Sequence, residues 1–393
     1  MNLKKDKVQQ KALLEWSKTK QATCILQTGM GKTFLFFKCL IKSKAKQCLF
    51  LAETDIRKKD VLKDCIKFKE IYGVDPLEGI DFKFMLYQSA HKKNIKEIFP
   101  KGKYFVCADE IDFAVSPVYW KFFLNDFKKN PVLCITATLD NISRVVFEGQ
   151  DIGTKREVLN QRFPICFEYG LEESVIDGTT RSLEIITIIH QLDSKEKNIT
   201  AGNKLKQWKQ TEANAYAYLN DNFRKILFMP DTSSKEFLLR NSAAKRATFL
   251  YNLPSKIESC KKLLSTLEGR TVVYGIHNEA LRKLGIPCVI QDEPRYKEIL
   301  EEFRSGEINQ IVGNRKLIRG ANLNKIDNIV HLSYYSSADI MRQKIGRMRD
   351  DLPFGKVFIY KTLGTQEEKW YESAIQPLLV FPQKEVIKIE DCI

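Results

Sequence analysis

The sequence predicts an α/β protein with two parallel-sheet domains in tandem and a helical insertion in the second. Its 393 residues are too many for a typical single domain and suit two domains of roughly 150–200 residues each. Short apolar runs alternate with amphipathic segments through the first half, and the alternation resumes in the second half after a polar interruption. Strands that alternate with helices are typical of a parallel sheet covered by helices on both faces.

The first domain contains five apolar runs that we predict as buried strands, at 24–26, 47–53, 82–89, 103–110 and 131–139. The segments between them, such as KTFLFFKCLIKSK, have apolar residues at helical spacing. Parallel sheets bind ligands at the carboxyl ends of their strands. Three short strings stand at such ends: GMGKT after the first run, DEID at the end of the fourth and TAT at the end of the fifth.

The second domain repeats the pattern, with predicted strands at 182–192, 270–277, 308–315, 328–335 and 356–363. A polar, Lys-rich, helix-like insertion separates the first two of these strands and spans residues 195–268. We place the domain boundary near 175–182, around the polar string IDGTTRS, and divide the chain into domains 1–178 and 179–393.

The insertion mixes lysines with five aromatic residues: Trp208, Tyr216, Tyr218, Phe223 and Phe228. Basic residues with aromatics can follow a single nucleic-acid strand by base stacking. Aromatics in a helix-like stretch more often form the core of a helical subdomain, and we favour this second interpretation.

The charge balance favours a polyanionic partner, because 64 Lys and Arg residues against 49 Asp and Glu residues give a net charge of +15. A lysine-rich proteome or a solubility effect would give the same excess. The ten cysteines show no C-x-x-C spacing, so we interpret them as free thiols in a reducing compartment. No apolar run reaches membrane-spanning length and the N-terminus lacks the apolar core of a signal peptide. We therefore expect a cytoplasmic protein without a membrane partner.

The string QTGMGKT predicts a phosphate-binding loop. Its glycines allow backbone N–H groups to turn inward around phosphate oxygens, Lys32 would reach the β- and γ-phosphates, and Thr33 would offer a hydroxyl to Mg²⁺. The general pattern would place glycine where this chain has Leu26, but the strand before and the helix-like run after favour a phosphate loop over a simple turn. The predicted nucleotide-binding residues of the loop are Thr28, Gly29, Met30, Gly31, Lys32 and Thr33.

Two acids follow the fourth strand of the first domain. Asp109 would hold Mg²⁺, directly or through water, and Glu110 would orient and deprotonate the attacking water. A lone pair of acids at a strand end is often a solvated turn, but the phosphate loop earlier in the chain makes that interpretation the poorer one. The four histidines show no ligand spacing, so we predict no metal other than the Mg²⁺ that accompanies the nucleotide.

These strings resemble the motifs of the superfamily 2 helicases and translocases, the DExH/D-box group, over nearly the whole chain. The resemblance implies two RecA-like domains that bind ATP and Mg²⁺ in the cleft between them. Thr136 and Thr138 fit the family's (S/T)-A-T motif, which couples hydrolysis to the grip on nucleic acid. Gln9 stands where the family has an adenine-reading glutamine, with Gln10 as the alternative register.

Two strings resemble loops of this family that contact the nucleic-acid backbone. In LFLAETDIRKKD the resemblance assigns this contact to Thr54 and Arg57, and in MLYQSAHK to Gln88 and Ser89. In the second domain, VVYGIHNEA resembles motif IV, and the segment ending in NIVHL resembles motif V, with Gly320 at its turn.

The string QKIGRMR resembles the family's sixth motif, Q-x-x-G-R-x-x-R, with the second arginine one place early. The resemblance implies catalytic roles for Gln343 and for Arg347, which would be the arginine finger supplied by the second domain. Arg349 is the alternative arginine finger. A solvated helix face would be the ordinary interpretation of these arginines if they stood alone.

The likeness is greatest to phage and type III restriction-like DNA helicases. It implies an ATP-dependent helicase or translocase that acts on DNA, by unwinding or by remodelling branches, inside a phage-infected or bacterial cell. We expect a monomer, with a protein partner for substrate targeting as a further expectation. Three alternatives stay open: the motor subunit of a restriction-type complex, an RNA helicase, and a non-hydrolysing nucleic-acid-binding protein that retains the fold.

Overall fold

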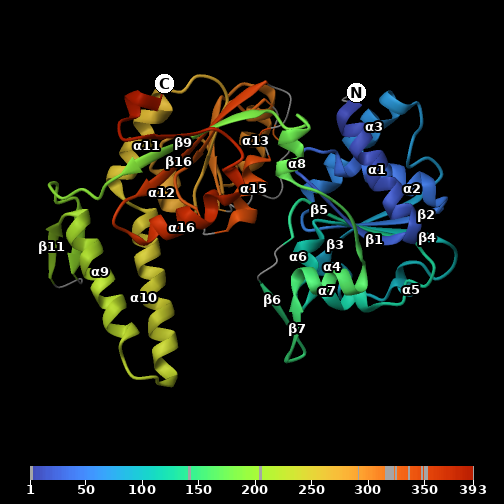
Figure 1. Cartoon of the computed structure of the whole chain (residues 1–393), viewed down its shortest axis with the longest axis horizontal. Coiled ribbons are helices and arrows are strands. Elements are labelled where there is room, and N and C mark those ends of the chain that lie inside the picture. Colours follow the sequence, from blue (N-terminus) through green and yellow to red (C-terminus); the bar gives the residue numbers. More distant parts are fainter. Residues whose placement is uncertain are drawn as a thin grey trace. The chain divides into compact units, whose positions relative to one another are not determined.

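The computed structural model of the chain describes residues 3–139, 143–202, 206–290, 292–314, 323, 325–334, 337–346, 348 and 353–392. The chain divides into two compact units, Met1–Arg181 with Arg342–Asp350, and Ser182–Met341 with Asp351–Ile393 (Figure 1). Each unit is built around a parallel sheet.

The sheet of the first unit has the strand order β3-β2-β4-β5-β1-β8, and every pair of neighbours is parallel. Its strands are β1 (Gln21–Leu26), β2 (Gln47–Ala52), β3 (Asp81–Leu86), β4 (Tyr104–Asp109), β5 (Val132–Thr136) and β8 (Ile165–Tyr169). The antiparallel hairpin of β6 (Arg144–Phe147) and β7 (Gln150–Thr154) stands apart from this sheet.

Helices cover this sheet on both faces. They are α1 (Leu3–Thr19), α2 (Lys32–Ser43), α3 (Ile56–Tyr72), α4 (Tyr87–Ala90), α5 (Ile95–Ile98), α6 (Ile111–Ala114), η1 (Tyr119–Leu124), α7 (Lys155–Arg162) and α8 (Leu171–Ile176). Successive residues of β4 enter different cores: Phe105 packs with residues of α1, α2 and α3, whereas Val106 packs with residues of η1 and α7. This alternation explains why the strand reads as one continuous apolar run.

The sheet of the second unit has the order β13-β14-β12-β15-β16-β9-β17, again with parallel neighbours. Its strands are β9 (Ser182–His190), β12 (Thr271–Tyr274), β13 (Cys288–Val289), β14 (Gln310–Gly313), β15 (Asn328–His331), β16 (Phe354–Thr362) and β17 (Gln383–Val386). The helices that follow α9 (Glu212–Leu227) and α10 (Ser233–Tyr251) along the chain are α11 (Pro254–Thr266), α12 (Asn278–Arg282), α13 (Tyr296–Ser305), α15 (Ala338–Ile345), α16 (Gln366–Ile375), η2 (Gln376–Leu378) and η3 (Ile389–Cys392). Of these, α15 begins in the second unit and ends in the first. The predicted fold class, two parallel-sheet α/β domains in tandem, is confirmed.

The ten strands predicted from apolar runs are all present, with shifts at their ends. The largest shift is at 328–335, because β15 ends at His331. The predicted strand 82–89 also ends early, because β3 ends at Leu86 and Tyr87 begins the short helix α4. The structure adds strands that the sequence did not suggest, namely β6, β7, β8, β10, β11, β13 and β17.

The predicted insertion contains a two-stranded ribbon and a long helical hairpin. The ribbon pairs β10 (Ile199–Gly202) with β11 (Gln207–Gln210), and the hairpin consists of α9 (Glu212–Leu227) and α10 (Ser233–Tyr251), which project away from the sheet of their unit (Figure 1). The helix α11 that follows packs Ile257, Cys260 and Leu263 into the core of this sheet.

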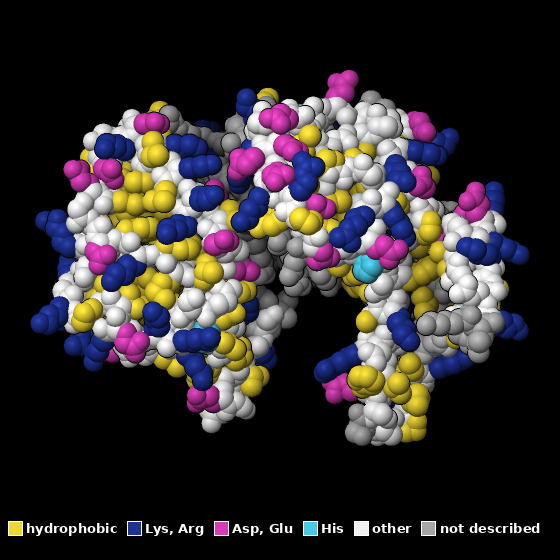
Figure 2. Space-filling view, turned by 180° about the vertical axis from the view of Figure 1, so that it is seen from behind, with side chains coloured by type: hydrophobic (Ala, Val, Ile, Leu, Met, Phe, Trp, Pro, Cys, Tyr) yellow, Lys and Arg dark blue, Asp and Glu magenta, His cyan; other side chains and the backbone are white. Residues whose placement is uncertain are grey.

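The interpretation of the insertion's aromatics as a helical core is wrong for three of the five. Tyr216 is buried against Leu250 and Leu253, as a core residue would be. Trp208, Tyr218 and Phe228 are exposed, and Phe228 reaches 83% exposure. Figure 2 shows apolar side chains among Lys and Arg side chains on this hairpin. Helical spacing alone did not reveal that these three aromatic side chains are exposed.

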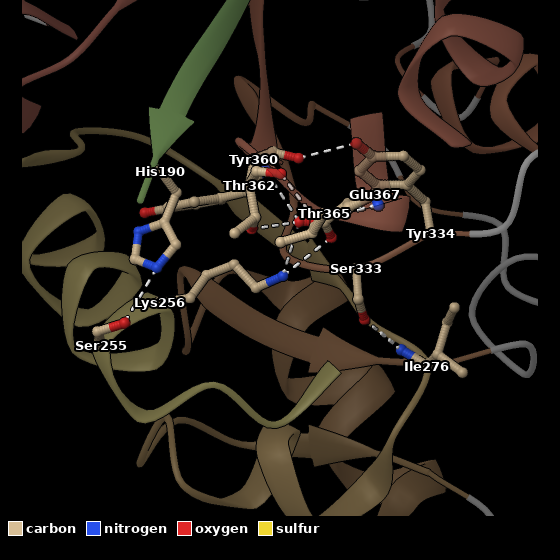
Figure 3. Close-up of polar contacts among 10 residues, drawn as sticks. All are labelled: His190, Ser255, Lys256, Ile276, Ser333, Tyr334, Tyr360, Thr362, Thr365 and Glu367. Carbon is tan, nitrogen blue, oxygen red and sulfur yellow. Dashed lines mark hydrogen bonds and ion pairs between the residues drawn. The ribbon is translucent and has the colours of Figure 1, made fainter. Parts of the chain in front are cut away.

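A buried ion pair ties two helices of the second unit together (Figure 3). Lys256 on α11 lies 2.9 and 3.1 Å from the two carboxylate oxygens of Glu367 on α16, and neither side chain is more than 1% exposed. The same carboxylate accepts hydrogen bonds from the backbone N–H and the hydroxyl of Thr362. Nearby, the imidazole of His190 is 3.0 Å from the hydroxyl of Ser255, and burial lowers the pKa of His190 to about 3, with Lys256 adding to the effect.

Among the described residues, no helix is both long and apolar enough to cross a membrane. The ten cysteines, all within the described ranges, are free thiols, as the sequence predicted.

Candidate functional site

The loop between β1 and α2 is shaped by two glycines in the left-handed region. Gly29 has φ of +89° and Gly31 has φ of +77°, a backbone conformation that L side chains rarely adopt. A Cβ at Gly31 would also lie 2.5 Å from Nε2 of Gln9, whereas nothing lies within 4 Å of a Cβ at Gly29. The loop ends where α2 begins at Lys32, so the free N–H groups of this helix face the loop, an arrangement that suits an anion.

Gln9 on α1 holds this loop from the side. Its amide nitrogen donates to the carbonyl of Met30 over 2.8 Å, and its amide oxygen accepts from Lys38 on α2 over 2.8 Å. Lys38 in turn lies 2.6 Å from Asp6. Of the two registers that the sequence left open, Gln9 is buried against the loop and Gln10 is exposed.

Lys32 and Glu110 form an ion pair at the ends of β1 and β4. Their charged atoms, Nζ and Oε1, are 3.0 Å apart, and Lys32 is largely buried while about a third of Glu110 is exposed. Glu110 has φ of +50°, since the chain turns sharply out of β4 into α6 at this residue. The ammonium of Lys32 and the carboxylate of Glu110 therefore face each other.

Asp109 and Thr33 are bridged by the guanidinium of Arg57, from the first turn of α3. Nε of Arg57 donates to Oδ2 of Asp109 over 2.5 Å, and Nη2 donates to the hydroxyl of Thr33 over 2.8 Å. Burial alone would lower the pKa of Arg57, but the adjacent carboxylate of Asp109 outweighs it and the pKa is raised. Arg57 is therefore charged at every pH at which the protein is folded.

Thr136, at the end of β5, connects the acids to the TAT string. Its hydroxyl lies 2.9 Å from Asp112 and 3.2 Å from Glu110, and it donates to the carbonyl of Thr138 over 2.7 Å. This hydroxyl therefore lies between the acids that follow β4 and the loop that follows β5.

The oxygens around Asp109 fit a Mg²⁺ ion bound with a nucleotide. Oδ1 of Asp109 is buried and has no hydrogen-bond partner among the described residues. The hydroxyl of Thr33 lies in the same cluster, because Arg57 contacts both residues. Carboxylate and hydroxyl oxygens are the hard ligands that Mg²⁺ prefers, and Mg²⁺ usually takes only one or two from the protein and the rest from phosphate and water.

The other predicted contacts of the first domain lie beyond this cluster. Gln88 and Ser89 are exposed on α4, and Thr54 is half-buried in the loop between β2 and α3. The amide of Gln88 donates to the carbonyl of Glu53 over 3.4 Å, so the two predicted nucleic-acid loops lie next to each other. Arg57, the fourth residue predicted to contact nucleic acid, lies in the cluster with Asp109 and Thr33.

The structure describes only part of the site residues that the sequence predicts in the second domain. Gln343 lies on α15, and its side chain is outside the described part of the structure. Gly320, Arg347 and Arg349 lie outside the described residues altogether. Within the described ranges, no group of three or more His, Cys, Asp and Glu side chains could hold a metal ion by itself.

Sequence reasoning missed several members of the site. Asp112 contacts Thr136, and the hydroxyl of buried Tyr87 donates to the carbonyl of Asp109 over 2.8 Å. Asp112 stands two residues after Glu110 in the string DEID, which was a usable signal. Tyr87 and the Lys38–Asp6 pair gave none, because they are brought to the site by packing alone.

Comparisons of the fold give several similar solved structures. Saccharomyces cerevisiae Dbp5 bound to RNA and ADP BeF3 matches with a TM-score of 0.59 and 12% identity, over 98% of this chain and 90% of that one. The Pyrococcus furiosus Hef helicase domain matches with a TM-score of 0.53 and 14% identity, over 93% and 97%. The ATP-dependent type ISP restriction-modification enzyme LlaBIII bound to DNA matches with a TM-score of 0.59 and 13% identity, over 98% of this chain and 31% of that one.

No protein-family model and no curated protein sequence matches the chain. At these identities the structural similarity shows the fold, which is that of two tandem RecA-like domains.

Proposed function

We propose that this chain is an ATP-dependent nucleic-acid helicase or translocase of superfamily 2 type, with DNA as the favoured substrate. Its ATP-binding domain would span 1–178 and its second domain 179–393. The observation that carries the proposal is the convergence of Lys32, Thr33, Asp109 and Glu110 at neighbouring strand ends, beside a glycine loop held open by Gln9.

The proposed roles follow from the chemistry of each group. Lys32 would leave Glu110 to bind the β- and γ-phosphates, and Glu110, once released, would accept a proton from the attacking water. Thr33 and Asp109 would hold Mg²⁺, which supplies charge neutralisation to the phosphate oxygens. Gln9 would read the adenine from its place beside Met30.

The second domain would complete the reaction. Gln343 and Arg347, or Arg349 in place of Arg347, would stabilise the charge of the transferring phosphoryl group, as an arginine finger does. Thr136, Thr138 and Gly320 would couple hydrolysis to movement on nucleic acid. Its backbone would be contacted by Thr54, Gln88 and Ser89, and by Arg57 once its guanidinium has left Asp109.

The preference for DNA rests on the sequence resemblance to phage and restriction-type DNA helicases, and the net charge of +15 supports a nucleic-acid partner of either kind. One similar structure is bound to RNA and another to DNA, so the fold does not choose between them. We propose that the protein acts as a monomer in the cytoplasm, with a partner that targets it.

The test is steady-state ATP hydrolysis without nucleic acid and with single-stranded DNA, branched DNA or single-stranded RNA. We expect DNA to stimulate turnover more than RNA. Replacing Lys32 with Ala should lower turnover by at least about 100-fold, because the phosphates lose their main cation. Lys42→Ala is the matched control, since Lys42 is exposed on the same helix.

Near-normal turnover in Lys32→Ala would refute the assignment of the site. Greater stimulation by RNA would make the chain an RNA helicase. Nucleic-acid binding without turnover in any condition would favour a binding protein that retains the fold, and turnover that appears only with a co-purifying nuclease would favour the motor of a restriction-type complex.

A further inference from the structure

Arg57 occupies the place where the proposed site needs a divalent cation. Its guanidinium contacts Thr33 and Asp109, the two residues proposed to hold Mg²⁺, at 2.8 and 2.5 Å. Three-quarters of the Arg57 side chain is buried and Asp109 is almost entirely so. A cation of the protein itself therefore balances the charge of this carboxylate.

The guanidinium and a divalent ion would compete for these oxygens, because Arg57 leaves only Oδ1 of Asp109 without a hydrogen bond among the described residues. Mg²⁺ requires its ligand oxygens at 2.0–2.1 Å in octahedral geometry, with those lone pairs directed at the metal. Nε and Nη2 of Arg57 already use a lone pair of Oδ2 and of the Thr33 hydroxyl. Two positive groups brought so close in a buried site would also repel each other strongly.

Two other carboxylates of α3 also attract the guanidinium of Arg57. It stands on the first turn of α3, and Asp60 and Asp64 of the same helix also raise its pKa. The negative charge of these two carboxylates would favour the guanidinium on their side of the helix after a rotation of its side chain. Arginine has the long, flexible stem that such a rotation requires.

We propose that Arg57 is a resident cation of the metal site, which holds Thr33 and Asp109 in the nucleotide-free protein and must swing away when Mg²⁺ enters with the nucleotide. The inference rests on the proposed function and deepens it. Mg²⁺ then replaces the guanidinium at Thr33 and Asp109 in a single step. The affinity for Mg²⁺ is lower than it would be if Arg57 did not contact these oxygens.

The competing explanation is that Arg57 stays beside the metal and orients Asp109. The two explanations predict opposite effects of removing the guanidinium. If Arg57 must leave, its removal strengthens metal binding, because the ion no longer competes with it. If Arg57 supports the metal, its removal weakens metal binding.

The experiment measures the dissociation constant of a fluorescent ADP analogue in excess Mg²⁺ and in a chelator that removes the metal. The ratio of the constant without metal to that with metal reports how much the ion contributes, independently of turnover. We expect Arg57→Gln to raise this ratio by about tenfold over the wild type, which is within the usual range of coupling between two ligands. Arg57→Lys should give an intermediate ratio, because one ammonium cannot bridge both oxygens as a fork does.

The matched control is Lys58→Gln, which removes a positive charge from the adjacent exposed position of α3 and should leave the ratio unchanged. An unchanged or lower ratio in Arg57→Gln would overturn the inference, and if this variant fails to fold, a wild-type ratio in Arg57→Lys would do so. If the wild type binds no adenine nucleotide in either condition, the proposed function itself fails.

Discussion

Two physical reasons favour glycine in the loop between β1 and α2: a positive φ at Gly29 and Gly31, and a lack of space for a Cβ at Gly31. Both have a positive φ, so an alanine at either position is strained. Only at Gly31 would the added Cβ also collide with the amide nitrogen of Gln9, at 2.5 Å. The contact with Gln9 is therefore a second reason for glycine at position 31.

We expect Gly31→Ala to weaken ATP binding more than Gly29→Ala does, by about tenfold. Alanine costs about 1 kcal/mol of strain at each site, and at Gly31 the displaced Gln9 also releases Met30. Isothermal titration with ATP and Mg²⁺ measures both variants. Equal losses would mean that the loop does not depend on its contact with Gln9.

Three edge strands of the two large sheets, β8, β13 and β17, were not predicted from the sequence. Most residues of β8 and β17 are at least partly exposed. The strands that were predicted from continuous apolar runs lie mostly in the interior, where both faces are covered, as for β4 and β5. The edge strand β3 is the exception, because its residues were predicted although most of them are only half-buried. Apolar runs report burial, so they are a weak signal for an edge strand.

The candidate site was also only partly predictable from the sequence. The glycine loop and the two acids were predictable because local geometry requires those residue types at fixed spacing. The bridge made by Arg57 was not, since it depends on how the first turn of α3 packs against the end of β4. An arginine in the string TDIRKKD can face solvent or the site, and only the packing decides.

The buried ion pair of Lys256 and Glu367 connects helix α11 to helix α16. We expect Lys256→Met to destabilise the protein by about 3–5 kcal/mol, because Glu367 would keep a buried charge without its partner. Lys261→Met on the same helix is the control: it removes a pair with Glu258 that is 40% and 63% exposed, and should cost at most about 1 kcal/mol. Urea unfolding measures both, and equal effects would show that burial of the pair is unimportant.

At the scale of the whole molecule, stability should depend on pH through His190. Its pKa is lowered from 6.5 to about 3 in the folded chain, so below pH 6.5 the unfolded chain binds the proton more readily and stability falls. Between pH 7.5 and pH 5.0 this residue should remove about 2 kcal/mol. His190→Gln should lose that part of the pH dependence, as measured by urea unfolding at both pH values. A variant with the wild-type slope would contradict the assignment.

The two ion pairs of the first unit, Lys32 with Glu110 and Arg57 with Asp109, have a further consequence for the stability of this unit. Charges taken out of water are costly unless opposite charges compensate them. Here two cations and two carboxylates of the protein itself cancel one another in pairs. Replacing either cation with a neutral side chain would therefore leave an uncompensated negative charge in this part of the protein.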